Sequence, residues 1–98
     1  MKIDFNTTIN NLDGNPLKIK SNDQEKNMTI GYILSSAAIV QLPTDDKMDV
    51  EEKIALFSIA KKVVDNEELT TEEMVLVKKR IGEMHGPLVV GRAYEILG

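Results

Sequence analysis

The clearest structural signal in this chain is residues 69–84, which read LTTEEMVLVKKRIGEM. Thr70 followed three residues later by Glu73 is the pattern of a capping box, in which each side chain accepts a hydrogen bond from the backbone N–H of the other residue. Leu69 and Met74 stand where a hydrophobic staple places its two residues. Apolar residues then recur three and four positions apart, at Met74, Val77, Ile81 and Met84. This spacing predicts an amphipathic helix that begins after Thr70.

Two further helices are expected on the N-terminal side of this one. Thr29 is a good N-cap, and apolar residues follow it at helical spacing, at Ile30, Ile33, Leu34, Ala37 and Ala38. Pro43 is expected to end that helix. Asp49 is expected to cap the next one, with acidic residues in its first turn as the helix dipole favours. Its apolar residues spread over a broad face: Ile54, Leu56, Phe57, Ile59, Ala60, Val63 and Val64.

The C-terminal segment is expected to form a fourth helix. His85-Gly86-Pro87 breaks the preceding pattern, and proline fits the first turn of a new helix. A strand over residues 88–91 is the alternative, because Val89-Val90-Gly91 is rich in residues that favour strands. A glycine within a helix costs roughly 1 kcal/mol relative to alanine, so Gly91 suggests a place where two backbones approach closely.

The first 27 residues differ in character from the rest. Residues 2–5 and 17–20 each alternate polar and apolar side chains, and Asp13-Gly14 between them is a strong turn dipeptide. A small hairpin or extended arm is therefore expected in residues 1–27, with a helical core in residues 28–98. The predicted fold is a single domain, mainly α, with a three- to four-helix bundle and a short N-terminal β-hairpin or extended arm.

Composition excludes several classes of function. The chain of 98 residues has no cysteine, which excludes disulfides, thiolate metal sites and cysteine nucleophiles. Its formal net charge of −4 and its lack of tryptophan make nucleic-acid binding an unfavourable interpretation. The N-terminal residues do not resemble a signal peptide, and no apolar run is long enough to span a bilayer. We therefore expect a cytoplasmic protein that does not bind membranes.

No catalytic residue, cofactor or metal site is expected from the residue pattern. His85 is the one histidine, and a helix end is where a histidine more often caps than catalyses. The acidic run of residues 45–52 lacks the central glycine of a calcium-binding loop and carries Met48 and Val50 within it.

A surface for a ligand or a partner is expected at five residues. Lys78, Lys79 and Arg80 are interpreted as the solvated back of their helix, with phosphate binding as the alternative. Tyr32 and Tyr94 each combine an apolar ring with a hydroxyl group, which suits either a binding surface or partial burial in the core.

The order of several short motifs resembles that of a group of small proteins encoded in bacteriophages and prophages. The motifs are Leu12-Asp13-Gly14-Asn15-Pro16, Thr29-Ile30-Gly31, Leu69-Thr70-Thr71-Glu72-Glu73 and Gly86-Pro87-Leu88-Val89-Val90-Gly91. The resemblance covers nearly the whole chain and implies a bacterial host. It implies no activity, so it assigns no role to any residue.

Three functions are compatible with these observations. The leading hypothesis is a non-enzymatic phage protein that acts by binding a host or phage protein. The alternatives are an oligomer that binds or sequesters a small ligand of the nucleotide type, and a phage assembly accessory such as a tail-assembly chaperone. The broad apolar face of residues 54–64 predicts a homodimer or higher homo-oligomer. A competing interpretation places that helix at the centre of the monomer, with neighbours on all sides.

Overall fold

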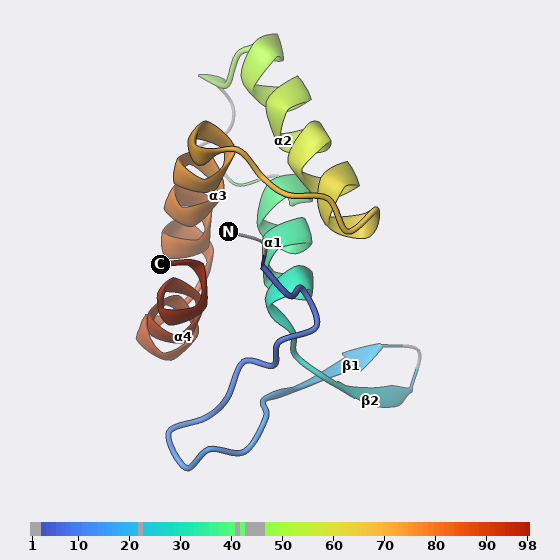
Figure 1. The fold of residues 1–98 in the computed structure, drawn as a ribbon, viewed down its shortest axis with the longest axis vertical. Coiled ribbons are helices and arrows are strands. Elements are labelled where there is room, and N and C mark those ends of the chain that lie inside the picture. The colour runs from blue at the N-terminus through green and yellow to red at the C-terminus, as the bar shows by residue number, and fades with distance from the viewer. Residues whose placement is uncertain (1–2, 22, 41, 43–46) are drawn as a thin grey trace.

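The computed structural model describes residues 3–21, 23–40, 42 and 47–98, so Pro43, Asp45 and Asp46 lie outside it. The chain is mainly helical, with a short N-terminal hairpin, as the sequence predicts (Figure 1). The elements in order are β1 (Lys18–Ser21), β2 (Gln24–Asn27), α1 (Ile30–Ile39), α2 (Val50–Val64), α3 (Thr71–Met84) and α4 (Pro87–Leu97). None of the helices in these ranges is long and apolar enough to cross a membrane.

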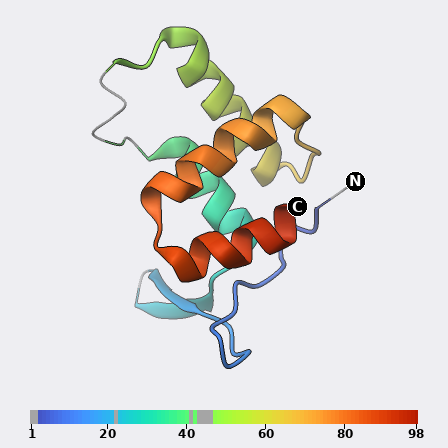
Figure 2. The ribbon, with the colours of Figure 1, turned by 90° about the vertical axis from the view of Figure 1, so that its left-hand side faces the viewer.

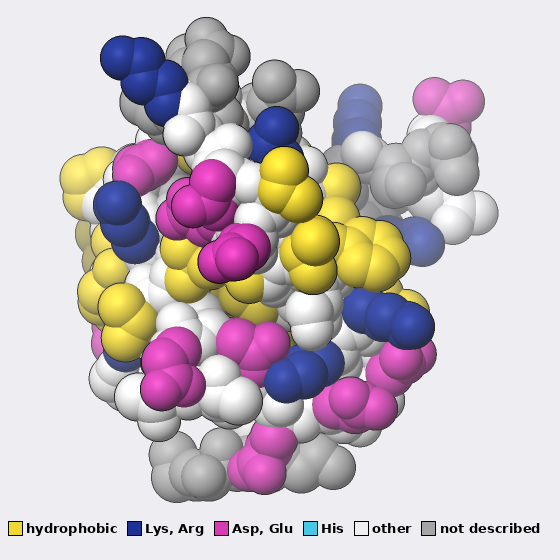
Figure 3. Space-filling view, turned by 90° about the horizontal axis from the view of Figure 1, so that it is seen from above, with side chains coloured by type: hydrophobic (Ala, Val, Ile, Leu, Met, Phe, Trp, Pro, Cys, Tyr) yellow, Lys and Arg dark blue, Asp and Glu magenta, His cyan; other side chains and the backbone are white. Residues whose placement is uncertain are grey.

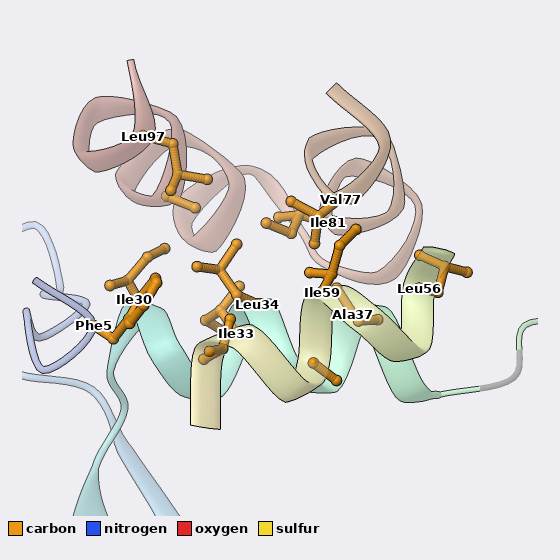
Figure 4. Packing of buried hydrophobic residues seen from close by; sticks show 14 of the residues in the cluster. Phe5, Ile30, Ile33, Leu34, Ala37, Leu56, Ile59, Val77, Ile81 and Leu97 are labelled. Carbon is orange, nitrogen blue, oxygen red and sulfur yellow. The ribbon is translucent and has the colours of Figure 1, made fainter. Parts of the chain in front are cut away.

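Helix α1 lies at the centre of the fold. It contacts α2, α3 and α4, and the latter two lie in front of it in Figure 2. Its apolar stripe is buried as expected, together with Gly31. Figure 4 shows how side chains from all four helices meet around it, among them Leu34 of α1, Ile59 of α2 and Ile81 of α3. The monomer therefore has one core, and α1 is its axis.

The N-terminus of α1 is buried, and other parts of the chain satisfy its free backbone N–H groups. Ile30 N donates to Thr7 O at 2.8 Å and Gly31 N donates to Phe5 O at 2.9 Å. The Thr29 hydroxyl accepts from Tyr32 N, as an N-cap should. A Cβ atom at Gly31 would lie 2.8 Å from Phe5 O. The close backbone approach in this fold is therefore made by Gly31.

Gly91 does not make such an approach within the monomer. Apart from its chain neighbours and the backbone of its own helix, no described atom lies within 4 Å of a Cβ placed there, and the residue is exposed. The segment around it is helical, so the alternative of a strand over residues 88–91 was wrong. Pro87 occupies the first turn of α4, as expected. Proline favours a helix start there because its missing N–H would have had no intrahelical partner.

The expected caps of α2 and α3 are confirmed. Asp49 accepts a hydrogen bond from Glu52 N at 2.8 Å. The complete capping box is present between Thr70 and Glu73. The same Glu73 carboxylate accepts a hydrogen bond from Lys62 Nζ at 2.7 Å, which joins the last turn of α2 to the first turn of α3. Burial raises the pKa of Glu73, but its hydrogen bonds to Lys62 and Thr70 outweigh that effect and leave the pKa below its ordinary value.

The alternation in residues 2–5 and 17–20 suggests that these two segments pair with each other, but β1 pairs with β2. Residues 18–21 pair antiparallel with residues 24–27, with Lys18 opposite Asn27. The expected turn at Asp13-Gly14 does form, and it closes an isolated bridge between Asn10 and Pro16. Residues 3–5, in contrast, form no strand: the chain turns there, with Thr7 N donating to Asp4 O, and Phe5 is buried in the core.

We predict that Thr70→Ala lowers the free energy of unfolding by about 1 kcal/mol, because the first turn of α3 loses its cap. Urea unfolding followed by circular dichroism measures this loss. Thr71→Ala is the matched control, since it removes the neighbouring hydroxyl and leaves the cap in place. Equal midpoints for Thr70→Ala and the control would contradict the prediction.

Candidate functional site

The five residues expected to form a ligand or partner surface do not form one site. Lys78 of α3 and Tyr94 of α4 lie side by side where the two helices pack against each other. The Tyr94 hydroxyl donates to Lys78 O at 3.0 Å, and Lys78 Nζ lies 5.4 Å from the centre of the Tyr94 ring. Lys78 Nζ also donates to Gly98 O. These groups therefore tie the two helices together, while exposed Tyr32 lies on α1.

The sequence suggested that Arg80 lies on a solvated helix face, and the structure corrects this interpretation. The Arg80 side chain is inside the fold, and the residue is only 4% exposed. Its Nε donates to Ala37 O at 2.6 Å and its Nη2 donates to Val40 O at 2.5 Å. The guanidinium thus satisfies backbone carbonyls at the C-terminal end of α1. A residue with this structural role is poorly placed to bind phosphate.

Lys79 lines a small pocket between the start of α2 and the second half of α3. The pocket has a volume of about 200 Å³, and its other charged lining residues include Lys47, Arg80, Glu52 and Glu83. Sites for drug-sized ligands are usually larger, about 300–1,000 Å³. Because two carboxylates lie among three cations, the pocket has no strong preference for an anion.

The most unusual surface of the molecule is an apolar stripe along α2. Four residues form this α2 stripe: Val50, Ile54, Phe57 and Val64, which are 68%, 62%, 61% and 78% exposed. They recur four, three and seven residues apart, which places them on one side of the helix. The buried side of α2 carries a different apolar set: Leu56, Ile59, Ala60 and Val63. Helix α2 therefore has two apolar faces and uses one of them in the core.

The interpretation of α2 as the central helix of the monomer was wrong. Helix α2 packs against α1 and α3 with its buried face only, and α1 occupies the central position. Figure 3 views the end of the molecule at which α2 begins, and shows hydrophobic side chains gathered on that surface with charged side chains around them. The broad apolar face that the sequence shows is thus divided between the core and the surface.

A second, shallower apolar surface lies between the turn after Asn10 and α4. It is a hollow of about 170 Å³ whose lining includes Leu12, Leu88 and Gly91. Arg92 holds the turn in place, with Nε donating to Asn10 O and Nη2 donating to Asn11 O, each at 3.1 Å. This hollow is smaller and more open than a usual ligand site.

His85 ends α3, and its backbone N–H donates to Ile81 O at 3.1 Å. Its Nε2 atom is buried and has no hydrogen-bond partner among the described residues. Burial lowers the pKa of His85 below its ordinary value of 6.5. Within the described ranges, no three His, Asp or Glu side chains are grouped so that they could hold a metal ion.

Comparison with known proteins identifies no relative of this chain: no protein-family model, curated protein or solved structure matches it.

We predict that Arg80→Met destabilises the protein by about 2–3 kcal/mol, because it leaves the buried carbonyl of Ala37 and the partly buried carbonyl of Val40 without their charged donor. Methionine preserves much of the side-chain volume, so packing changes little. Lys79→Met is the matched control, as it removes an exposed cation from the adjacent position. Chemical denaturation of the two variants and the parent measures the difference. A loss in Lys79→Met as large as that in Arg80→Met would contradict the structural role of Arg80.

We also predict that His85 makes stability depend on pH. In the unfolded chain His85 takes up a proton as the pH falls through 6.5, whereas the folded chain does so only at lower pH. The free energy of unfolding should therefore fall as the pH drops below 6.5. The corresponding change from Glu73 is centred at lower pH, between its ordinary pKa of 4.5 and its lower pKa in the folded chain. Urea unfolding between about pH 5 and 7 should show this slope in the parent and a smaller slope in His85→Gln. An unchanged slope would contradict the assignment.

Proposed function

We propose that this protein has no chemistry of its own and acts by binding another protein through the α2 stripe. The observation that carries the proposal is the exposure of Val50, Ile54, Phe57 and Val64 on one side of a single helix. Contiguous exposed apolar patches on soluble domains commonly mark interaction sites. An amphipathic helix that presents its apolar side is also a recurring form of protein recognition.

The partner in this proposal is a protein encoded by the phage or by its bacterial host, encountered in the host cytoplasm. The support is the resemblance of the sequence motifs to those of small phage proteins. The assembly-accessory alternative makes use of the same surface, since such a factor also acts by binding protein. Partner identity separates these two interpretations.

The nucleotide-binding alternative has less support from the geometry. It needs the basic residues 78–80 to act together with an aromatic ring. Lys78 and Tyr94 are adjacent, but they are engaged in joining α3 to α4. Arg80 is occupied with α1. A rise in melting temperature with any member of a nucleotide panel would favour this alternative.

The proposal predicts that Phe57→Asp abolishes capture of the partner without unfolding the protein. Phe57 is largely exposed, so a charge there is hydrated in the free protein and must be desolvated in a complex. The parent and the variant are immobilised and incubated with lysates of uninfected and phage-infected bacteria. Each retained protein is then purified, and its affinity for the parent and for each variant is measured by titration.

Val75→Asp is the matched control, because Val75 is an apolar residue on α3 whose exposure, 65%, is close to the 61% of Phe57. We expect the parent and the control to retain the same partner and Phe57→Asp to lose at least about tenfold in affinity, because the introduced charge loses its hydration in the complex. Equal affinity of Phe57→Asp and the parent for every retained protein would overturn the proposal.

A further inference from the structure

We infer that a second copy of this chain covers the α2 stripe, with the two α2 helices packed antiparallel and Phe57 close to the twofold axis. This inference rests on the proposed function: the second copy covers the α2 stripe of the free protein reversibly, and a different partner protein binds the stripe by displacing that copy. The observations behind it are the symmetry of the stripe and the distribution of charge along α2.

The spacing of the stripe matches a twofold arrangement. Val50 and Val64 each lie seven residues from Phe57, on opposite sides of it. Seven residues are nearly two full turns, so all three side chains share one side of the helix, with about 10 Å of rise on each side of Phe57. When a second helix is laid antiparallel across Phe57, its Val64 meets Val50 of the first and its Phe57 meets Phe57. A self-complementary patch of this kind is what a twofold interface requires.

Charge selects the antiparallel direction. The first turn of α2 carries Glu51 and Glu52, and its last turn carries Lys61 and Lys62. Glu51 and Lys61 are exposed and lie ten residues apart, about 15 Å along the helix, which is too far for an ion pair within one chain. Lys62 is already paired with Glu73 of its own chain.

An antiparallel second copy brings the acidic turn of each helix beside the basic turn of the other. With Phe57 on the axis, Glu51 lies within two residues, about 3 Å of rise, of the level of Lys61 of the second copy and on the same flank of the stripe, and the same contact occurs twice by symmetry. Exposed Lys53 is level with Lys61 of the second copy but stands on the opposite flank. A parallel pair would instead place Glu51 beside Glu51 and Lys61 beside Lys61. The aliphatic part of Lys61 also extends the apolar surface, because a lysine side chain can cover apolar groups while its ammonium group stays in water.

The α2 stripe is a small surface for a dimer interface. Helix α2 has 15 residues, about 22 Å of helix, so a contact between two such helices is at the small end of specific interfaces. We therefore expect a reversible dimer with a dissociation constant on the order of 1–100 µM.

Sedimentation velocity over a wide concentration range is the first test. The mass should rise from 10.9 kDa toward twice that value in the parent and in Val75→Asp. In Phe57→Asp the dissociation constant of the dimer should be at least about tenfold larger. A single mass of 10.9 kDa at every concentration overturns the dimer.

Charge reversal tests the direction of packing. Glu51→Lys and Lys61→Glu should each weaken the dimer severalfold, and the double variant should restore it, because the pair is then reversed and still complementary. The two residues are too far apart to pair within one helix, so a structural effect on the monomer would not produce this rescue. Lys79→Glu controls for the change in net charge. Weakening by both single variants without rescue by the double variant overturns the antiparallel pairing.

Disulfide trapping tests the register, and the absence of native cysteine makes it clean. Val50→Cys and Val64→Cys proteins should cross-link to each other under mild oxidation when they are mixed, and each should remain largely uncross-linked alone. Preferential cross-linking of Val50→Cys to itself would show parallel packing and overturn the inference. A monomer that still captures a different protein in a Phe57-dependent way overturns the dimer and leaves the proposed function standing.

Discussion

The fold depends on satisfying the backbone groups at both ends of α1, the helix at the centre of the molecule. Free N–H groups of α1 donate to Phe5 O and Thr7 O of the N-terminal segment, and carbonyls at its C-terminal end accept from Arg80 of α3. A buried helix end without partners would be strongly destabilising. These bonds draw two segments that are distant in sequence onto α1, and they explain why an arginine belongs in the core of this protein.

With α1 at the centre, a chain of 98 residues has too little material to cover every apolar face. Small domains bury a smaller fraction of their surface than large ones. Helix α2 packs on α1 and α3 with one face, and its opposite face, the α2 stripe, stays exposed. The candidate interaction surface is thus a consequence of how the core is arranged. The two apolar sets on α2 differ in position by only a few residues, but they have separate roles.

The basic run of residues 78–80 illustrates how much of the candidate site the sequence could reveal. Successive residues on a helix point about 100° apart, so three adjacent cations cannot share one environment. Lys78 joins α3 to α4, Lys79 stays exposed and Arg80 is buried. Composition and charge alone indicate a basic cluster for ligands. The signal that Arg80 is different was its position three residues after Val77 and one before Ile81, which places it at the edge of the buried side of α3.

The sequence by itself determined the features that arise within one turn of helix: the caps at Thr29, Asp49 and Thr70, the start of α4 at Pro87 and the stripe that α1 buries. These depend on neighbouring residues, so their signal is local. Only the tertiary structure decided the rest. It paired β1 with a polar strand that has no pattern of alternation, brought Phe5 against Gly31, buried Arg80, and left one apolar face of α2 exposed. Each of these depends on which distant segment occupies the space beside α1. Residue spacing places Arg80 at the edge of a buried face, but it does not identify the carbonyls of α1 as its partners.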